Sequence, residues 1–324
     1  MSAVRPQTSV SDVAIVALFG PTGVGKTAVA VELAHLLRGR GEHPVAVSAD
    51  ALQVYEDLDV LAAKPSVDDL DRLEHRMLSI VPIDRTFSVA EFSERAHREI
   101  DAIADEGGRP IVVGGTGLYL RAALTELELK PPADPELRNQ IERELEAIGS
   151  LELHRQLSPR TAESIHPNDR KRIVRALELE RMGSRPYETS AQLWSEELRR
   201  PASLFGIVME RDPLEARIAE RVRRMLESGA LAEVELAIER GVSSTAAKAI
   251  GVEELAAHLS GEATLEEAAA RIERRSIQYA KRQLTWMKKM RGVHLIDRTR
   301  TSDAEVAAQL LERLAGSLEP ATSH

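Results

Sequence analysis

Residues 19–29 read FGPTGVGKTAV, and Gly20, Gly25, Lys26 and Thr27 fit the phosphate-loop pattern G-x-x-x-x-G-K-[ST]. Glycines let backbone N–H groups turn toward an anion, and the start of a helix adds partial positive charge. The lysine supplies a mobile positive charge, and the threonine offers a hydroxyl to Mg²⁺. The stretch predicts a phosphate-binding site. It does not say whose phosphates bind, and ATP is the default candidate.

Asp50 is the candidate base. It ends the apolar stretch VAVSAD, and an aspartate after an apolar strand also holds magnesium in phosphate-loop ATPases. As a helix N-cap or a more distant magnesium ligand it would take no part in proton transfer. In the functional interpretation, its carboxylate accepts a proton from an N–H or O–H of an acceptor. The amide of Gln53, one turn later, could then read a base edge.

A second glycine-rich stretch, VGGTGLYL at 113–120, follows another apolar run. Its Thr116 could donate a hydrogen bond to a bridging or leaving phosphate oxygen. A Gly-Gly turn alone is a weak signal. At the end of a strand beside a phosphate loop, it favours a role in the site.

The elements that must position these residues alternate along the first third of the chain. Strands are expected at 13–19, 44–48 and 110–113, and helices at 27–37 and 89–105. Short apolar strands separated by helices indicate an α/β fold with a parallel sheet and helices on both faces. Ligands of such sheets sit at the carboxyl ends of the strands. We therefore expect the phosphate loop, Asp50 and residues 114–117 to form one site.

The pattern changes to almost continuous helical periodicity over 135–200, with breaks at 158–159, at 166–169 and at Gly183. We predict a helical insertion in the α/β core. The expected organisation is a disordered lead (1–12), a core (13–130 and 201–300), the insertion (131–200) and a C-terminal helix with a tail (301–324). Within the second part of the core we expect a strand at 204–209, a helix from 212 to about 228, further helices to about 291 and an apolar stretch at 293–296.

Composition limits the function classes. The chain has 324 residues, a formal net charge of −9 and no cysteine, which excludes disulfides, thiolate metal sites and a cysteine nucleophile. The first twelve residues lack the apolar core of a signal peptide. No apolar run approaches the roughly 18 residues of a membrane span. A cytoplasmic protein without a membrane segment is the expectation.

One helical segment departs from the acidic average. Residues 268–293 carry eight Lys or Arg residues and one acid, Glu273. At about 100° per residue, one face collects Arg271, Arg275, Gln278, Arg282, Thr285 and Lys289, with Arg274, Lys281 and Lys288 beside it. The opposite half holds Ile272, Tyr279, Leu284, Trp286 and Met287. A single-sign stripe of about five turns indicates a polyanion such as nucleic acid. The basic stretch HPNDRKRIVRALE (166–178) is more ambiguous, because a charge run is usually a solvated face.

These stretches carry a family likeness. GPTGVGKT, SADALQVY with AKP (48–55 and 63–65), VGGTGLYL, PADPELR (132–138), HPNDRKRIVRALE and YAKRQLTW (279–286) follow one another along residues 14–292. In these motifs and their order the chain resembles the bacterial tRNA dimethylallyltransferases, also called isopentenyl-tRNA transferases. The resemblance implies a phosphate-loop NTPase-like core with a helical, tRNA-binding insertion (131–200). It also implies transfer of a dimethylallyl group from dimethylallyl diphosphate to N6 of the adenosine 3′ of the anticodon, with release of pyrophosphate.

The resemblance also implies roles by position. Diphosphate binding falls on Gly20, Thr22, Gly23, Val24, Gly25, Lys26, Thr27 and Arg217, with Mg²⁺ on Thr27. Asp50 would accept the N6 proton, and Thr116 would sit at the transfer point. The anticodon stem-loop of tRNA would contact Asp50, Ala51, Leu52, Gln53, Thr116, Arg138, Lys171, Arg172, Arg175, Lys248, Arg275, Gln278, Lys281 and Arg282, within segments that include 248–253 and 276–283. We expect a monomer.

Some positions depart from the family pattern. Ala51 replaces a serine of D-S-x-Q-V-Y, and Leu61 and Ala62 replace the first two residues of G-T-A-K-P. Val252 and Glu253 stand where an aromatic and a basic residue are common, and Ser276 and Ile277 where Thr-Arg is usual. Each lost polar group could cost on the order of 1 kcal/mol of recognition or positioning. The departures leave the efficiency of tRNA recognition open.

Three alternatives stay open from the sequence. A kinase for a nucleotide or metabolite, with residues 170–175 as a lid, would consume ATP but would not use the basic stripe. A non-catalytic RNA-binding ATPase switch would leave Asp50 and Thr116 without a role. A prenyltransferase for free AMP or ADP would not need a five-turn stripe, because its acceptor is a mononucleotide.

Overall fold

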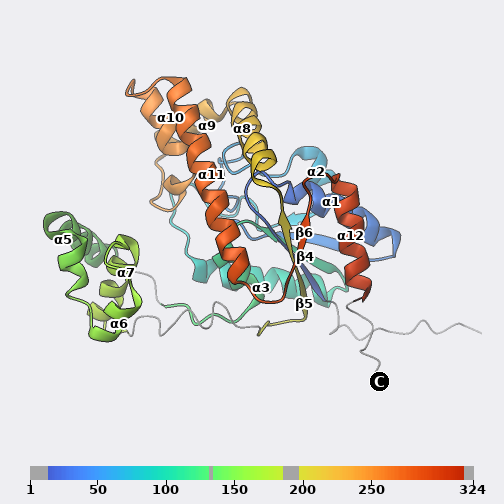
Figure 1. The fold of residues 1–324 in the computed structure, drawn as a ribbon, viewed down its shortest axis with the longest axis horizontal. Coiled ribbons are helices and arrows are strands. Elements are labelled where there is room, and N and C mark those ends of the chain that lie inside the picture. Colours follow the sequence, from blue (N-terminus) through green and yellow to red (C-terminus); the bar gives the residue numbers. More distant parts are fainter. Residues whose placement is uncertain (1–13, 131–133, 185–196, 317–324) are drawn as a thin grey trace, which may run out of the picture. The chain divides into compact units, whose positions relative to one another are not determined.

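The computed structural model describes residues 14–130, 134–184 and 197–316 (Figure 1). In this part of the chain, six parallel strands form one sheet in the order β3-β2-β4-β1-β5-β6. The strands are β1 (Ile15–Phe19), β2 (Pro44–Ser48), β3 (His75–Arg76), β4 (Arg109–Gly114), β5 (Ala202–Val208) and β6 (Val293–Asp297). The predicted α/β fold with a parallel sheet is confirmed.

The helices are α1 (Lys26–Gly39), α2 (Val67–Arg72), α3 (Val89–Asp105), α4 (Gly117–Leu124), α5 (Pro135–His154), α6 (Pro159–Ser164), α7 (Arg170–Arg181), α8 (Arg211–Glu227), α9 (Ala230–Arg240), the short 3₁₀ helix η2 (Ala246–Lys248), α10 (Val252–Leu259), α11 (Leu265–Lys289) and α12 (Asp303–Gly316). The bounds of β2 and α3 agree with the sequence prediction. A capping box of Ser88 and Glu91 fixes the start of α3. Strand β3 was not predicted, since it has only two residues and no apolar run.

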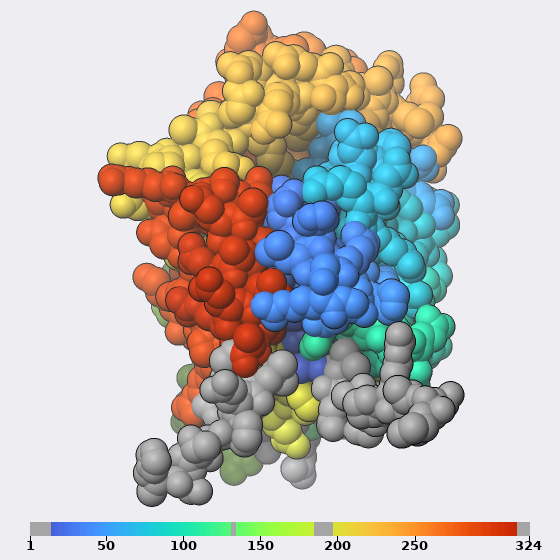
Figure 2. Space-filling view, turned by 90° about the vertical axis from the view of Figure 1, so that its right-hand side faces the viewer, coloured from blue at the N-terminus to red at the C-terminus, as the bar shows by residue number. Residues whose placement is uncertain are grey.

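The sheet is covered on both faces. All five residues of β1 are buried, and successive side chains of a strand point to opposite faces. Val16 and Leu18 pack in a cluster with residues of α1 and α12, so Ile15, Ala17 and Phe19 face the other side. Helices α1 and α12 lie side by side, as the blue and red surfaces of Figure 2 show. A doubly covered sheet explains why its central strands read as continuous apolar runs.

The chain divides into two compact units, residues 1–126 with 196–324 and residues 127–195. The second unit contains α5, α6 and α7 and has its own apolar core, which includes Ile141, Leu145, Leu153, Ile173 and Leu177. Its bounds begin and end a few residues before those of the predicted insertion, 131–200. The predicted breaks recur here: α6 begins at Pro159, and α7 begins after the N-cap Asp169. The predicted disordered lead, 1–12, lies outside the described residues.

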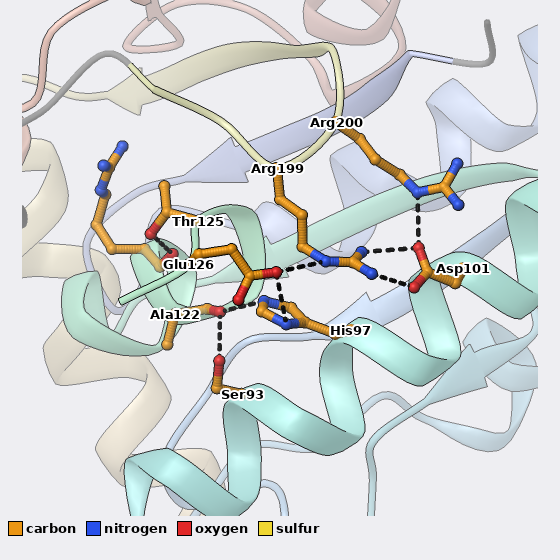
Figure 3. A network of polar contacts seen from close by, with 9 residues as sticks. Ser93, His97, Asp101, Ala122, Thr125, Glu126, Arg199 and Arg200 are labelled. Atoms are coloured by element: carbon orange, nitrogen blue, oxygen red, sulfur yellow. Dashed lines mark hydrogen bonds and ion pairs between the residues drawn. The ribbon is translucent and has the colours of Figure 1, made fainter. Parts of the chain in front are cut away.

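A polar network anchors the two points where the chain leaves and re-enters the first unit (Figure 3). The Arg199 backbone N–H donates to the Leu124 carbonyl over 2.8 Å. The Arg199 guanidinium donates to Glu126 (2.9 Å) and to Asp101 of α3 (2.7 Å), and Arg200 donates to the same aspartate over 2.6 Å. The hydrogen bond from Arg199 lowers the pKa of Asp101. Both connections are therefore fixed to α3 by charge-assisted hydrogen bonds.

None of the described helices combines the length and the apolar character that a membrane crossing requires.

Candidate functional site

The phosphate loop forms a tight turn between β1 and α1. Gly23 and Gly25 have φ values of +80° and +89°, a left-handed conformation that glycine adopts at little cost. A side chain at Gly25 would also overlap the guanidinium of Arg298. That arginine is 4% exposed and donates to the Val24 carbonyl over 2.6 Å. Arg298 thus supports the phosphate loop. The sequence analysis missed it, because no motif near residue 298 indicates a contact with the loop.

Lys26 lies at the centre of the loop. Its ammonium donates to the Gly20 and Pro21 carbonyls over 3.0 and 3.1 Å. Burial lowers the pKa of Lys26 to about 8, although the nearby Asp50 carboxylate favours the charged form. The Lys26 side chain thus folds back onto its own loop. An anion bound there would stabilise the protonated form of the ammonium.

Two arginines of α8 reach the loop from the other side. Arg217 donates to the Gly23 carbonyl over 2.9 Å. Arg221 donates to the Thr22 hydroxyl over 2.8 Å and to the Leu61 carbonyl over 3.1 Å. Residues four apart share one helix face, and this spacing from Arg217 is the signal that could have identified Arg221. The predicted diphosphate residues are thus brought together, with a second guanidinium beside them.

A cavity of about 340 Å³ opens beside the loop. Its polar wall includes Lys26, Thr27, Asp50, Arg217 and Arg221. Its apolar wall includes Leu52, Leu61, Val222, Met225, Ile250 and Ile272. A cavity of this kind suits a ligand with an anionic group and a short apolar group.

Of the two predicted catalytic residues, Asp50 lines this cavity and Thr116 does not. Asp50 accepts a hydrogen bond from the Leu52 N–H over 2.9 Å and lines the wall. The Thr116 hydroxyl accepts a hydrogen bond from the N–H of Ala51, the residue after Asp50, over 3.4 Å, and lies 3.2 Å from the Tyr279 hydroxyl. Burial, reinforced by the Asp50 carboxylate, raises the pKa of Tyr279 to about 12. Tyr279 therefore stays a neutral hydroxyl beside the candidate base.

The loop after β2 is held by side chains of its own and by Glu233 of α9. Ser48 donates to the Gln53 amide oxygen over 2.8 Å, and the Gln53 amide nitrogen donates to the Ala63 carbonyl over 3.0 Å. The predicted base-reading role of Gln53 stays a prediction, and it would require these bonds to exchange. The Glu233 carboxylate accepts the N–H groups of Val60 and Leu61 over 2.7 and 2.9 Å. Hydrogen bonds between side chains and the backbone thus fix the loop, including Leu61, where the sequence departs from the family pattern.

Helix α11 presents cations on its outer face. Eight of its predicted polar or basic residues are exposed: Arg271, Arg274, Gln278, Lys281, Arg282, Thr285, Lys288 and Lys289. Arg275 is different, because it forms ion pairs with Glu253 (2.9 Å) and Glu254 of α10. The helix itself carries few acids, as its sequence showed, but two acids of α10 face the stripe at Arg275.

The prediction that 276–283 lies along tRNA stays a prediction, and only the exposed side chains of this range could contact RNA. Ser276, Ala280 and Gln283 are buried on the inner face of α11. The Gln283 amide bonds to the phosphate loop and to Gly115. A helix of 3.6 residues per turn must turn some positions of such a range inward, but the sequence did not indicate that a glutamine would be among them.

The unit of residues 127–195 holds four further predicted RNA contacts, Arg138, Lys171, Arg172 and Arg175. Glu178 is fully buried, and its carboxylate lies 3.3 Å from the Arg138 guanidinium and 3.0 Å from that of Arg175. Lys171 and Arg172 are exposed on α7, and Arg172 lies 3.4 Å from Asp169. The structure thus brings Arg138 and Arg175 together. Lys248, on η2 of the other unit, is exposed.

No cluster of three or more His, Cys, Asp or Glu side chains suited to a metal occurs among the described residues. Thr27 and Asp50 both line the cavity and offer oxygen atoms. Mg²⁺ in phosphate sites needs only one or two protein ligands, because phosphate oxygens and water complete its shell. The donor set fits magnesium held with a phosphate ligand.

Comparison with known proteins agrees with this geometry. The family model "IPP transferase" matches residues 53–290. A protein of Acetivibrio thermocellus named tRNA dimethylallyltransferase is 36% identical over 312 residues, which cover 93% of this chain and 97% of the relative. The crystal structure of a Bacillus halodurans tRNA isopentenylpyrophosphate transferase has a TM-score of 0.69 and 34% identity, and the match covers 95% of this chain and 97% of that one.

A eukaryotic dimethylallyltransferase acting on tRNA has the same fold, with a TM-score of 0.74, at 24% identity over 96% of this chain and 81% of that one. The family model spans more than half of the chain, and the bacterial relatives match it over nearly their whole length. The chain therefore belongs to the IPP transferase family.

Proposed function

We propose that the chain transfers a dimethylallyl group from dimethylallyl diphosphate to N6 of the adenosine 3′ of the anticodon in tRNA, releasing pyrophosphate. One observation carries the proposal: a phosphate loop, a carboxylate and an apolar wall share one cavity, and α11, which lines part of it, exposes cations on its outer face. The relative from Acetivibrio thermocellus, named tRNA dimethylallyltransferase, supports it.

The donor fits the two walls of the cavity. The loop N–H groups, Lys26 and the arginines at 217 and 221 would neutralise the diphosphate. The apolar wall would take the dimethylallyl group. Mg²⁺ held by the Thr27 hydroxyl would supply further charge neutralisation as the pyrophosphate leaves.

The acceptor would enter from the side of Asp50. The target base must leave its stack to bring N6 into the cavity. A bond forms between N6 and the allylic carbon, the carbon–oxygen bond breaks, and its electron pair leaves with pyrophosphate. The N6 proton passes to Asp50. Holding both reactants in one cavity supplies much of the rate through orientation.

The test uses purified protein, magnesium, radiolabelled dimethylallyl diphosphate and unmodified tRNA with adenosine 3′ of the anticodon, with AMP and ATP in parallel reactions. We expect label in tRNA and none in AMP. Label in AMP would indicate a free-nucleotide prenyltransferase. ATP consumption without labelled RNA would refute the proposal, because the loop would then hold ATP.

A further inference from the structure

Gln283 is a buried polar residue that the reaction as described does not use. It is 4% exposed, yet both ends of its amide have partners. Its oxygen accepts the Thr22 N–H of the phosphate loop over 2.8 Å, and its nitrogen donates to the Gly115 carbonyl over 2.7 Å. We infer that Gln283 is a positioning residue that couples RNA binding on the outer face of α11 to diphosphate binding in the phosphate loop. The inference rests on the proposed function.

The contacts of Gln283 join three segments that are distant in the sequence. Thr22 is 261 residues away and Gly115 is 168 residues away. The fit is close, because a side chain at Gly115 would overlap the Gln283 amide and would meet the Lys26 ammonium. The amide therefore sets the spacing between the phosphate loop and the turn that carries Thr116.

A second side chain of α11 holds the same turn. Tyr279 lies one helical turn before Gln283, on the same side of the helix. Its hydroxyl is 3.2 Å from that of Thr116. Two adjacent positions of the inner face of α11 thus contact consecutive residues, Gly115 and Thr116.

The outer face of the same turn carries charge. Lys281 and Arg282 are exposed next to Gln283, and the Arg282 guanidinium lies 5.6 Å from the centre of the Tyr279 ring. RNA phosphates bound here would restrain the helix, and the two inner side chains would pass that restraint to the donor site. Two ligands that order one element bind more tightly together than alone, and the effect is reciprocal.

The test measures the coupling with inorganic pyrophosphate, which binds without reacting. Calorimetry with magnesium gives the pyrophosphate Kd with and without saturating unmodified anticodon stem-loop RNA. For the natural protein we expect RNA to tighten pyrophosphate binding about tenfold, within the usual range of coupling between two sites. Gln283→Met keeps the length of the side chain but removes both hydrogen bonds, and we expect a coupling below about twofold.

Two further variants separate positioning from folding. Gln309→Met lies on α12, which carries none of the site residues, and should keep the full coupling. Gln283→Glu keeps the acceptor for Thr22 but loses the donor to Gly115, and it should also lose coupling. Thermal unfolding checks that each variant is folded, and if Gln283→Met is unfolded, Gln283→Glu decides.

The outcomes distinguish the inference from the function on which it rests. If the natural protein labels tRNA but its pyrophosphate Kd is the same with and without RNA, the coupling inference is overturned and the function stands. Full coupling in a folded Gln283 variant also overturns it. If the natural protein does not label tRNA, the proposed function itself fails.

Discussion

Two helices of this protein carry basic clusters, and their inner faces have different tasks. In α7 the inner residues Ile173 and Leu177 pack in the apolar core of their own unit. In α11 the inner residues Tyr279 and Gln283 contact the two glycine turns of the candidate site. RNA bound to the two outer faces should therefore act differently. Of these two helices, only α11 has inner side chains that contact the candidate site.

The cations of the two helices are also held differently. The buried Glu178 orients Arg138 and Arg175 in the unit of α7. On α11, Arg271, Arg274, Lys281 and Lys288 are exposed and form no ion pair with any residue in the described ranges. A buried carboxylate orients the guanidinium groups beside it, but its negative charge lowers the net positive charge of that cluster. We therefore expect α7 to contribute oriented contacts, and α11 to contribute a strong electrostatic field.

The largest effect should come from the reaction side of this comparison. Asp50→Asn removes the proposed base but keeps the size of the side chain, so we expect the single-turnover transfer rate to fall about 100-fold or more. RNA affinity should stay within about twofold, since both basic helices are untouched. Rapid-quench measurements with labelled donor check the rate. Asp71→Asn on the exposed side of α2 is the control, and near-normal turnover of Asp50→Asn would remove the residue from the role of base.

The next effect concerns the pH dependence of donor binding. The pKa of Lys26 is about 8 in the folded protein, lowered from its ordinary value of 10.5 by burial. The ammonium therefore prevails below pH 8 and is lost as the pH rises through that value. The Kd for pyrophosphate with magnesium should be nearly constant from pH 6.5 to 7 and should weaken up to about tenfold per pH unit well above 8.

Calorimetry across this pH range measures the Lys26 effect, with Lys26→Met as the reference for the titration of pyrophosphate itself. The difference between the two proteins should show the inflection near pH 8. If both proteins follow the same curve, the Lys26 ammonium does not contribute to diphosphate binding. RNA affinity measured without pyrophosphate should lack this inflection, which keeps donor binding distinct from the basic helices.

A smaller effect is expected in the unit of α7. Glu178→Gln leaves Arg138 and Arg175 without the buried carboxylate that orients them, so we expect an RNA Kd about fivefold weaker and a loss of stability of about 1–3 kcal/mol. The transfer rate at saturating RNA should change less than twofold. Filter binding, thermal unfolding and single-turnover kinetics check these three results. A fall in the saturated rate would show that α7 acts on the chemistry as α11 does. Glu152→Gln, an exposed substitution on α5, is the control.

The sequence predicted those parts of the site whose signals are local. The phosphate loop combines a motif with its strand and helix, and Asp50 lies at the end of an apolar strand. Arg221, Arg298 and Gln283 reach the loop from more than 190 residues away, and their contacts depend on how α8, β6 and α11 pack on the sheet. The pattern of α11 separated charged from apolar positions, but it could not show that a polar inner side chain would find partners in two distant turns.

The acid opposite α11 gives the smallest expected change and tests the electrostatic part of the comparison. Glu253, which is 80% exposed, pairs with Arg275 at 2.9 Å, and the buried Glu254 holds the same guanidinium. RNA phosphates must compete with both carboxylates for Arg275. Glu253→Gln should tighten RNA binding about twofold, because an exposed ion pair is worth less than about 1 kcal/mol. The slope of log Kd against log salt should steepen as one more cation becomes available to phosphate. Glu239→Gln on α9 is the matched control. Unchanged affinity and slope would mean that Glu254 alone holds Arg275, which would then belong to the structure of α10 and α11 and not to the RNA surface.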